Sequence, residues 1–194
     1  NLLAVPYNSG LRIVDTSGGN TVKDYPSADG PYVADGLACG RQYFQGGYKR
    51  MEARDSKSGK LRWTYSDMQN YCQAAPVLDG NDIIFGAWDT RLRCLDARNG
   101  KLRWEWTNGK TNNLFSPGNV VPVVTSDKVI IVAPDRYMTA IDRSTGRTIW
   151  RDNSHRYRES LGVSADGSRA YAKTMDGELV AVSTRSNDFS ELWT

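Results

Sequence analysis

The chain has little of what most catalytic and metal sites require. Its 194 residues contain a single histidine, His155, which excludes a histidine-rich metal site or a pair of catalytic histidines within this sequence. The three cysteines form no Cys-x-x-Cys pair, which argues against a zinc knuckle or a thioredoxin-type site. No apolar run approaches the ~18 residues of a transmembrane helix, and no signal peptide is visible. The net charge of +3 is too small to indicate a nucleic-acid partner.

The missing motifs narrow the chemistry further. There is no Gly-x-Ser-x-Gly nucleophile elbow, no phosphate-binding Gly-x-x-x-x-Gly-Lys loop and no EF-hand calcium loop. Cys39, Cys72 and Cys94 are expected to be buried free thiols that act as small hydrophobic side chains, with one disulfide and one leftover thiol as the alternative. His155 lies in a basic stretch, where a structural or solvated role is expected. We therefore predict no catalytic residue and no metal site.

What the sequence does contain is one unit repeated five times. Each copy has an apolar residue, Leu or Met, followed two positions later by Ile, Ala or Cys, so that both side chains share one face of a strand. The copies are Leu11–Asp15, Met51–Asp55, Leu92–Asp96, Met138–Asp142 and Leu179–Ser183. Their last residues are spaced 40 to 46 positions apart (15, 55, 96, 142 and 183). A repeat of this period indicates a modular fold.

Turn residues travel with the repeated segments. A glycine follows four residues after each Asp, where a tight hairpin requires positive φ; these are Gly19, Gly59, Gly100 and Gly146. Short apolar runs precede each segment, and Asp-Gly pairs at 35–36, 79–80 and 166–167 join them as hairpins, with Ser126-Asp127 in the same role. In the second copy this places Leu37–Cys39 as the second strand. No ten-residue helical pattern occurs.

Each unit therefore reads as four short antiparallel strands in about 40 to 45 residues, which is typical of a β-propeller blade. The predicted fold is all-β, a single partial or open propeller segment of about 4.5 blades over residues 1–194. The blade ranges are approximately 1–26, 31–66, 74–107, 119–151 and 159–194. A tryptophan on the fourth strand is expected to fill the wedge between neighbouring blades; these structural residues are Trp63, Trp104, Trp150 and Trp193. The first copy has Lys23 at that position and is degenerate.

Two of the copies resemble a known repeat. The runs Leu95–Trp104 (LDARNGKLRW) and Ile141–Trp150 (IDRSTGRTIW) are similar to the Ala-x-Asp-x-x-Thr-Gly-Lys-x-x-Trp repeat of the PQQ-like, or quinoprotein-type, β-propellers. The resemblance covers nearly the whole chain and is specific for the fold rather than for a function. The family includes quinone-dependent dehydrogenases, an outer-membrane assembly lipoprotein, secreted proteins without a quinone, and propellers joined to a catalytic domain.

The resemblance also sets expectations about completeness and cofactors. Family members commonly close with seven or eight blades, so we expect a fragment of a larger bacterial propeller, with missing blades or a homodimer covering the open faces. A second chain completing an arc and a tight five-blade ring are the alternatives. Quinone enzymes of the family use adjacent cysteines, calcium ligands and an aspartate base. No adjacent cysteines occur here, and no partner spacing supports Asp89 or Asp135 as a base, so neither PQQ nor calcium is expected.

In antiparallel blades the loops between second and third strands emerge on the same face as the connections between blades. These loops are longer than the turns of the opposite face, and function concentrates on longer loops of a rigid scaffold. Aromatic side chains mixed with charged ones there suit a protein, glycan or small-molecule ligand, the alternative being a solvated rim of mixed charge. The candidate ligand-binding residues are Trp88, Asp89, Arg91, Asp135, Arg136, Tyr137, Arg158 and Glu159.

The function expected from this pattern is a non-catalytic binding or scaffold module. The resemblance alone places it in a bacterial envelope, periplasmic or secreted protein. One alternative is an accessory propeller serving a catalytic domain outside this chain, such as a metallophosphoesterase or a kinase. A quinone-dependent dehydrogenase is the less favoured alternative, and an adaptor in outer-membrane assembly is a further one.

Overall fold

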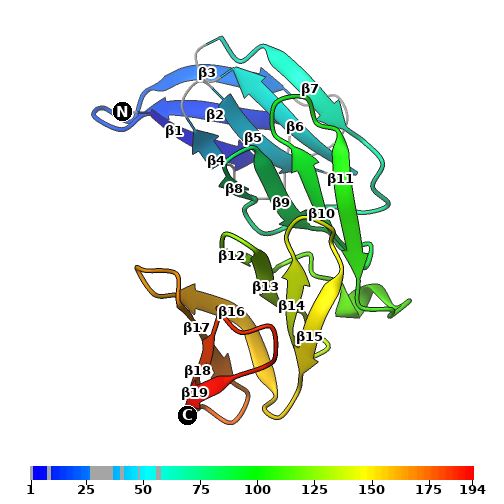
Figure 1. The fold of residues 1–194 in the computed structure, drawn as a ribbon. Coiled ribbons are helices and arrows are strands. Elements are labelled where there is room, and N and C mark those ends of the chain that lie inside the picture. Colours follow the sequence, from blue (N-terminus) through cyan, green and yellow to red (C-terminus); the bar gives the residue numbers. More distant parts are fainter. Residues whose placement is uncertain (1, 8–9, 27–36, 40–41, 48, 56–57) are drawn as a thin grey trace.

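The computed structural model describes residues 2–7, 10–26, 37–39, 42–47, 49–55 and 58–194, and these form antiparallel sheets. The sheets follow one another in chain order along an arc, from β1 in blue to β19 in red (Figure 1). Apart from the short 3-10 helix η1 (Asn113–Phe115), the regular elements of the described residues are strands. The all-β propeller architecture predicted from the repeats is confirmed.

The strands divide into one three-stranded and four four-stranded sheets. Sheet 1 contains β1 (Leu2–Tyr7), β2 (Gly10–Asp15) and β3 (Thr21–Pro26). Sheet 2 contains β4 (Leu37–Cys39), β5 (Gln42–Gly47), β6 (Arg50–Asp55) and β7 (Leu61–Tyr65). Sheet 3 contains β8 (Val77–Asp79), β9 (Asp82–Gly86), β10 (Arg91–Asp96) and β11 (Leu102–Thr107). Sheet 4 contains β12 (Val123–Val124), β13 (Lys128–Val132), β14 (Met138–Asp142) and β15 (Thr148–Asp152). Sheet 5 contains β16 (Tyr157–Val163), β17 (Arg169–Thr174), β18 (Leu179–Ser183) and β19 (Glu191–Trp193).

No helix among the residues that the structure describes has the length and apolar character needed to cross a membrane.

The repeated segments supply one strand of each sheet, and their apolar residues face the neighbouring sheets. Hydrophobic clusters fill the spaces between consecutive sheets: one joins sheets 2 and 3, a second joins sheets 3 and 4, and a third joins sheets 4 and 5. Sheets 3 and 4 bury apolar residues on both faces because each has a neighbouring sheet on either side, so stacking rather than a single enclosed core stabilises the fold. An inner sheet is thus held mainly by the one before it and the one after it.

Aromatic side chains of one sheet lie on the turn glycine of the next. Trp63 of β7 donates from Nε1 to the carbonyl oxygen of Ala97 at 2.9 Å, across the boundary between sheets 2 and 3. Its ring covers Gly100, where a Cβ atom would come within 2.6 Å of the indole. Gly100 has φ +73°, so this position needs glycine both for its backbone and for the ring that lies against it.

The same joint recurs at two other boundaries, one of them in modified form. Trp104 donates to the carbonyl oxygen of Arg143 at 2.7 Å and covers Gly146. In sheet 1 the ring on the next turn glycine is Tyr25, which lies against Gly59. Tyr25 is two residues beyond the expected position at Lys23, so a tyrosine replaces the tryptophan that the first copy lacks.

The last two tryptophans differ from this pattern. Trp150 is buried and packs edge-on against Phe189 with ring centroids 5.4 Å apart, but its Nε1 has no hydrogen-bond partner among the described residues. Sheet 5 has no Asp-x-x-x-Gly turn to supply the usual carbonyl and glycine. Trp193, expected to fill a wedge between blades, is instead 44% exposed and lies near Tyr171 of its own sheet.

Two of the three cysteines can be placed in these interfaces. Cys72 and Cys94 are free, buried thiols within the clusters that join sheets 2 and 3 and sheets 3 and 4. Burial raises the pKa of both, that of Cys94 to about 12, so both thiols stay protonated at neutral pH. The Cys39 side chain lies outside the described part of the chain.

One strand assignment from the sequence is wrong. Leu37–Cys39 forms the first strand of sheet 2, and Gln42–Gly47 is the second, paired with β6. The Gln- and Gly-rich run does not look like a strand, which is why the apolar triplet was favoured. The register shows this: the third residue of each repeated segment pairs with a residue of the second strand nine or ten positions before it, as in Phe44↔Ala53 and Ile84↔Cys94. The predicted Asp35-Gly36 turn lies outside the described residues.

Candidate functional site

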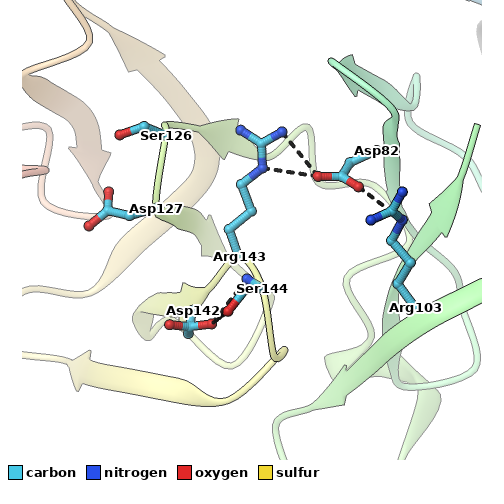
Figure 2. Close-up of a pocket in the computed structure, with 7 residues that line it drawn as sticks. All are labelled: Asp82, Arg103, Ser126, Asp127, Asp142, Arg143 and Ser144. Carbon is cyan, nitrogen blue, oxygen red and sulfur yellow. Dashed lines mark hydrogen bonds and ion pairs between the residues drawn. The ribbon is translucent and has the colours of Figure 1, made fainter.

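A cavity lies where sheets 3 and 4 meet, at the end of the sheets that carries their tight turns. We call this end the turn face; it comprises the turns at residues 80–81, 97–101, 125–127, 143–147 and 164–168. The cavity has a volume of about 400 Å³. It is lined by Asp82, Arg103, Ser126, Asp127, Asp142, Arg143 and Ser144 (Figure 2).

Arg143 is the central side chain of this cavity. It follows β14, and its guanidinium reaches across to sheet 3, where Nε and Nη2 donate to Asp82 Oδ2 at 3.1 and 3.0 Å. The same group donates to the Asp79 carbonyl oxygen at 3.0 Å and to the Thr125 carbonyl oxygen at 2.9 Å, and it pairs with the Asp79 carboxylate. One side chain therefore joins the first hairpin of sheet 3 to the turns of sheet 4.

Asp82 stands between two guanidinium groups, as Figure 2 shows. Arg103 of β11 approaches Asp82 Oδ1 at 3.2 Å and Asp96 Oδ2 at 3.0 Å. Hydrogen bonds from Arg98 above all, and the nearby charge of Arg103, hold the pKa of Asp96 well below its usual range. The carboxylate is thus ionised, and the pairs fix the arginines in place at the wall of the cavity.

The turn that follows β14 forms part of the cavity wall, and its conformation is fixed by the side chain of Asp142. Asp142 accepts hydrogen bonds from the backbone N–H groups of Ser144 and Thr145 at 3.0 and 2.8 Å, and from both hydroxyls. These donors, that of Ser144 first, lower the pKa of Asp142. An Asp followed by hydroxyl residues and a glycine therefore closes the hairpin through its own side chain and leaves its carboxylate ionised at the cavity.

A second cavity, of about 380 Å³, continues along the turn face between sheets 4 and 5. Its lining consists of Thr125, Ser126, Asp127, Asp166, Gly167, Thr184 and Arg185, so it shares Ser126 and Asp127 with the first. We call the two together the turn-face groove. Hydrogen bonds from Ser164 and Ser168 lower the pKa of Asp166, and one from Lys128 lowers that of Asp127. Both carboxylates are more than half exposed.

The side chains that line the groove can form ion pairs and hydrogen bonds with a ligand. The described residues that line it offer carboxylates, guanidinium groups and hydroxyls, and none of them is a histidine or a cysteine. Across the described residues, no three His, Cys, Asp or Glu side chains are grouped so that they can hold a metal ion. His155 lies outside the groove, with Nε2 3.1 Å from Glu191 Oε2 and its ring edge-on to Tyr157.

The residues predicted to bind a ligand belong to the opposite end of the sheets. We call this end the loop face; it comprises the loops at 87–90, 133–137 and 175–178 and the connections at 66–76, 108–122 and 153–156. Trp88, Asp89, Asp135, Arg136 and Tyr137 lie in its loops, and Arg91 begins β10. Arg158 and Glu159 lie within β16, not in the connection before it, at an irregularity of its register.

Asp89 is engaged inside the protein. Its carboxylate accepts two hydrogen bonds from the buried Arg93, at 3.0 and 2.8 Å, and a third from the backbone N–H of Gln69 at 3.0 Å. Gln69 belongs to the connection from sheet 2, so Asp89 ties that connection to sheet 3. A buried, fully paired carboxylate of this kind has a structural role that its place in a loop did not reveal.

Asp135 occupies the equivalent loop position in sheet 4 and has a similar structural role, because it too accepts hydrogen bonds from side chains of the protein. It accepts hydrogen bonds from Asn108 at 2.9 Å and from Arg151 at 2.6 Å, and Asn108 comes from the preceding sheet. Tyr137 lies under the Arg151 guanidinium, 4.4 Å from it to the ring centroid. Asp135 and Tyr137 are therefore brought together around one arginine.

The remaining loop-face predictions fall into separate places. Trp88 donates from Nε1 to Gln73 at 3.0 Å, and Arg136 pairs with Glu159 at 3.0 Å, which joins sheets 4 and 5. Arg91 pairs with Glu105 beside a cavity of about 180 Å³ lined by Asp67, Gln69, Arg91, Arg93 and Glu105. Arg158 is exposed. The eight residues thus form a sheet 3 group and a sheet 4–sheet 5 group rather than one constellation.

Sequence reasoning missed the turn-face groove. Its residues lie in or beside the short turns, which from the sequence alone are expected only to connect strands. The sequence did contain one signal, because charged residues stand next to several of these turns. Arg103 and Arg143 adjoin the turns after two repeated segments, and Asp79 and Asp82 flank a hairpin turn. Which of these charges face one another depends on how consecutive sheets stack, and that is not written in the spacing.

Comparisons with known proteins agree with this architecture. The model of the family described as outer membrane protein assembly factor BamB matches residues 10–114 and again 106–193. No match was found among curated proteins. Solved structures that resemble the chain include BamB from Moraxella catarrhalis (17% identity, TM-score 0.71), the computationally designed Ika8 protein (14%, 0.74) and a chain of the Mitotic Checkpoint Complex (15%, 0.76).

At these identities the structural matches show the fold alone. In the order given, the aligned regions cover 96%, 93% and 99% of this chain but 62%, 55% and 62% of the matched chains. This chain therefore spans less than two thirds of the length of each matched chain. The two matches to the family model together take in most of the sequence, including all the copies with the Asp-x-x-x-Gly turn followed by tryptophan. The chain therefore belongs to the BamB family of PQQ-like β-propeller repeat proteins.

Proposed function

We propose that the chain is a non-catalytic binding and scaffold module of a bacterial envelope protein, and that the turn-face groove holds a polar segment of a partner protein. The observation that carries the proposal is the groove itself. Its two cavities, of about 400 and 380 Å³, share Ser126 and Asp127 and cross two sheet boundaries. Small-molecule pockets are lined mostly by apolar side chains, whereas this groove is lined by charged and hydroxyl side chains, so an extended polar segment of chain fits it better.

The partner's chemistry follows from the charges that line the groove. Arg103 in the first cavity and Arg185 in the second present exposed guanidinium groups, and the exposed carboxylates of Asp127 and Asp166 line the groove beside them. A segment carrying both an acidic and a basic side chain can pair with both sets. The lining arginines are held by ion pairs before any partner arrives, so little side-chain entropy is lost on binding.

The location proposed for the module rests on its family. The matching family is described as an assembly factor of outer membrane proteins, which supports an envelope protein as the partner and an envelope, periplasmic or secreted location. PQQ and calcium are not part of this proposal.

A second ligand surface is proposed on the loop face, because aromatic and charged side chains gather there in two groups. Arg91 borders the cavity of about 180 Å³, and the exposed Arg158 lies close in sequence to the Arg136–Glu159 pair. Trp88 and Tyr137 add aromatic surface, whereas Asp89 and Asp135 are expected to support the loops rather than to touch a ligand. This surface suits a glycan or a peptide.

The two surfaces can be compared by site-specific photo-crosslinking in bacterial cells that export the chain. A photoreactive residue placed at Ser126 is expected to trap one defined envelope protein, and one placed at Arg158 is expected to trap it far less. The charge reversal Asp127→Lys should reduce the Ser126 adduct severalfold. Asp176→Lys is the control for surface charge, because Asp176 is an equally exposed carboxylate on the loop face. Asp127 also pairs with the buried Lys128, so circular dichroism of purified Asp127→Lys checks that this variant stays folded.

Each outcome bears on the proposal. Strong adducts from Arg158 with none from Ser126 would move the binding site to the loop face. An adduct at Ser126 that is insensitive to Asp127→Lys would show that the charges of the groove do not select the partner. No specific adduct from either position would refute the binding role.

A further inference from the structure

A small cavity on the loop face lies where the connection from sheet 2 meets sheet 3. It has a volume of about 180 Å³ and is lined by Asp67, Gln69, Arg91, Arg93 and Glu105. The first two residues belong to the connection after β7, and the other three belong to β10 and β11. The cavity therefore lies at an inner boundary, with one wall from the connection and one from the strands of sheet 3.

The strand wall places three charged side chains on one face of sheet 3. Arg91 and Arg93 are two positions apart on β10, and Arg93 pairs in register with Glu105 of β11. Glu105 forms an ion pair with Arg91, so these two charges compensate each other. Arg93 is the most buried of the three, since its side chain is only 2% exposed.

Arg93 keeps one N–H group without a partner. Its two terminal nitrogens donate to Asp89 at 3.0 and 2.8 Å, whereas its buried Nε has no hydrogen-bond partner among the described residues. Glu105 Oε2 is 3.6 Å from Nε, which is beyond hydrogen-bond distance. The Tyr65 hydroxyl, which lies near the same guanidinium, is also buried and has no described partner. An unpaired buried N–H group carries a desolvation penalty, so a ligand that brings an acceptor to Nε removes that penalty.

The connection wall offers polar groups that the protein itself does not use. Asp67 and Gln69 are exposed, and their side chains form no hydrogen bond or ion pair with the described residues. A carboxylate only accepts hydrogen bonds, whereas a primary amide both donates and accepts them. A ligand in this cavity is therefore offered donors and acceptors by both walls.

Hydroxyl groups satisfy these requirements together. A hydroxyl can accept from the Arg93 Nε–H group and donate its own hydrogen to Glu105, and it thus joins two groups that are too far apart to bond directly. A ligand carboxylate would accept from Arg93 but would face the carboxylates of Asp67 and Glu105. An ammonium group would pair with those carboxylates but would leave the Nε–H group unmet. The cavity therefore favours an uncharged ligand with several hydroxyls.

The size of the cavity limits how much of a ligand it can take. Pockets for whole drug-sized ligands have volumes of ~300–1,000 Å³, so a cavity of about 180 Å³ holds one compact ring. Aromatic side chains lie next to the cavity residues in the sequence. Tyr71 and Trp88 are partly exposed, with ring centroids 6.3 Å apart, and they offer flat apolar surface for the C–H face of a further ring.

We propose that this cavity binds one uncharged sugar ring of a glycan. Ring hydroxyls bond to Arg93, Glu105 and Asp67, and the rest of the glycan extends over the loop face. The proposal rests on the second ligand surface proposed above, and it names the cavity and the ligand class of that surface. A peptide side chain is the competing occupant, and the test includes it.

Binding is measured by NMR on the nitrogen-15-labelled chain, in which the Nε–H group of Arg93 gives its own resonance. The probes are the methyl glycosides of glucose, galactose, mannose and N-acetylglucosamine. Acetamide, acetate and methylguanidinium serve as small stand-ins for amide, carboxylate and arginine side chains. At least one glycoside is expected to shift the Arg93 resonance in a saturable way, at lower concentration than any stand-in.

Asp67→Asn removes the charge of an exposed acceptor and should weaken binding of that glycoside about tenfold in the same titration. Asp188→Asn is the matched control, because Asp188 is an exposed carboxylate in the turn between β18 and β19, and it should bind as the wild type does. Backbone amide spectra check that both variants stay folded, which is expected since both side chains are exposed.

Three results overturn the proposal. The first is that no glycoside shifts the Arg93 resonance. The second is that a stand-in shifts it at lower concentration than every glycoside, which would assign the cavity to a peptide side chain. The third is that Asp67→Asn binds as Asp188→Asn does. None of these results changes the crosslinking expected at Ser126, because the turn-face groove lies at the other end of the sheets, so failure of sugar binding and failure of the proposed function are distinguishable.

Discussion

Substituting Gly146 with alanine tests whether the tryptophan-on-glycine joint holds consecutive sheets together. Gly146 has φ +73°, a conformation that costs an L-residue about 1–2 kcal/mol. An added Cβ would also lie 2.9 Å from atoms of Trp104, so the ring or the turn must move. Overpacking of this kind costs about 1–3 kcal/mol. Gly146→Ala is therefore expected to destabilise the chain by about 2–5 kcal/mol in total.

Gly167→Ala separates the two contributions. Gly167 has a similar φ, +68°, but has no described atom within 4 Å of the position of a Cβ, so only the backbone cost of about 1–2 kcal/mol applies. Equilibrium urea unfolding, followed by circular dichroism and by tryptophan fluorescence, gives the free energy of unfolding of each variant. The difference between the two variants measures the contact between Trp104 and the turn.

A double-mutant cycle sharpens the comparison. In a Trp104→Leu background the indole atoms that lie 2.9 Å from the added Cβ are gone, although the Cβ of position 104 remains, so Gly146→Ala should cost less than it does in the wild type. Equal destabilisation by the two glycine variants in the wild-type background, within about 0.5 kcal/mol, would refute the joint as the source of inter-sheet stability. An unchanged cost of Gly146→Ala after removal of the indole would refute it as well.

Three further predictions follow from the hydrogen bonds. Trp104→Phe removes a hydrogen bond to the backbone carbonyl of Arg143, whereas Trp150→Phe removes a buried N–H group that has no described partner. In urea unfolding, Trp104→Phe should therefore lower the free energy of unfolding by about 1–3 kcal/mol more than Trp150→Phe does. Arg143→Ala should lower the free energy of unfolding by about 1–3 kcal/mol because charged hydrogen bonds between sheets 3 and 4 are lost. Arg156→Ala, which removes an ion pair exposed on both sides, should change it little, and equal effects would contradict the bridging role. Because the folded-state pKa of Asp142 is lowered, its carboxylate adds stability above pH ~4 and loses that contribution as the pH falls further. The difference in free energy of unfolding between wild type and Asp142→Asn should therefore narrow in unfolding curves measured from pH 5 to pH 3. A constant difference would contradict a stabilising role of the ionised carboxylate.

Strand content and blade architecture could be predicted because they depend on local spacing. The alternation in segments such as Leu92–Asp96, followed by a turn glycine, is compatible with a hairpin and with little else. The prediction was wrong where local signals conflict, as at Gln42–Gly47, whose glycines and glutamines hide a strand that only pairing with β6 defines. In other copies the third residue of the repeated segment pairs with a residue about ten positions earlier, and the same spacing in the second copy points to Gln42–Gly47 as the partner strand.

The candidate site was harder to predict because its residues come from different sheets. The sequence predicts that Asp89 and Asp135 lie in surface loops and contact a ligand. Both carboxylates instead accept hydrogen bonds from arginine or asparagine side chains within the protein. The groove lies at the turns, where Arg143 and Asp82 meet across 61 positions of sequence. Such meetings are set by the stacking geometry, and no local pattern encodes them.

Leu179 and Trp193 show where local information ends. The repeat assigns them the same residue types, strand positions and register as Leu92 and Trp104, because those properties depend on neighbours a few residues away. Whether each side chain is buried depends instead on whether another sheet lies against it, and here the two pairs differ completely. The period and the turns of the sequence dictate the blades; only the stacking of blades in space decides which charges pair, where the groove opens and which apolar side chains are buried.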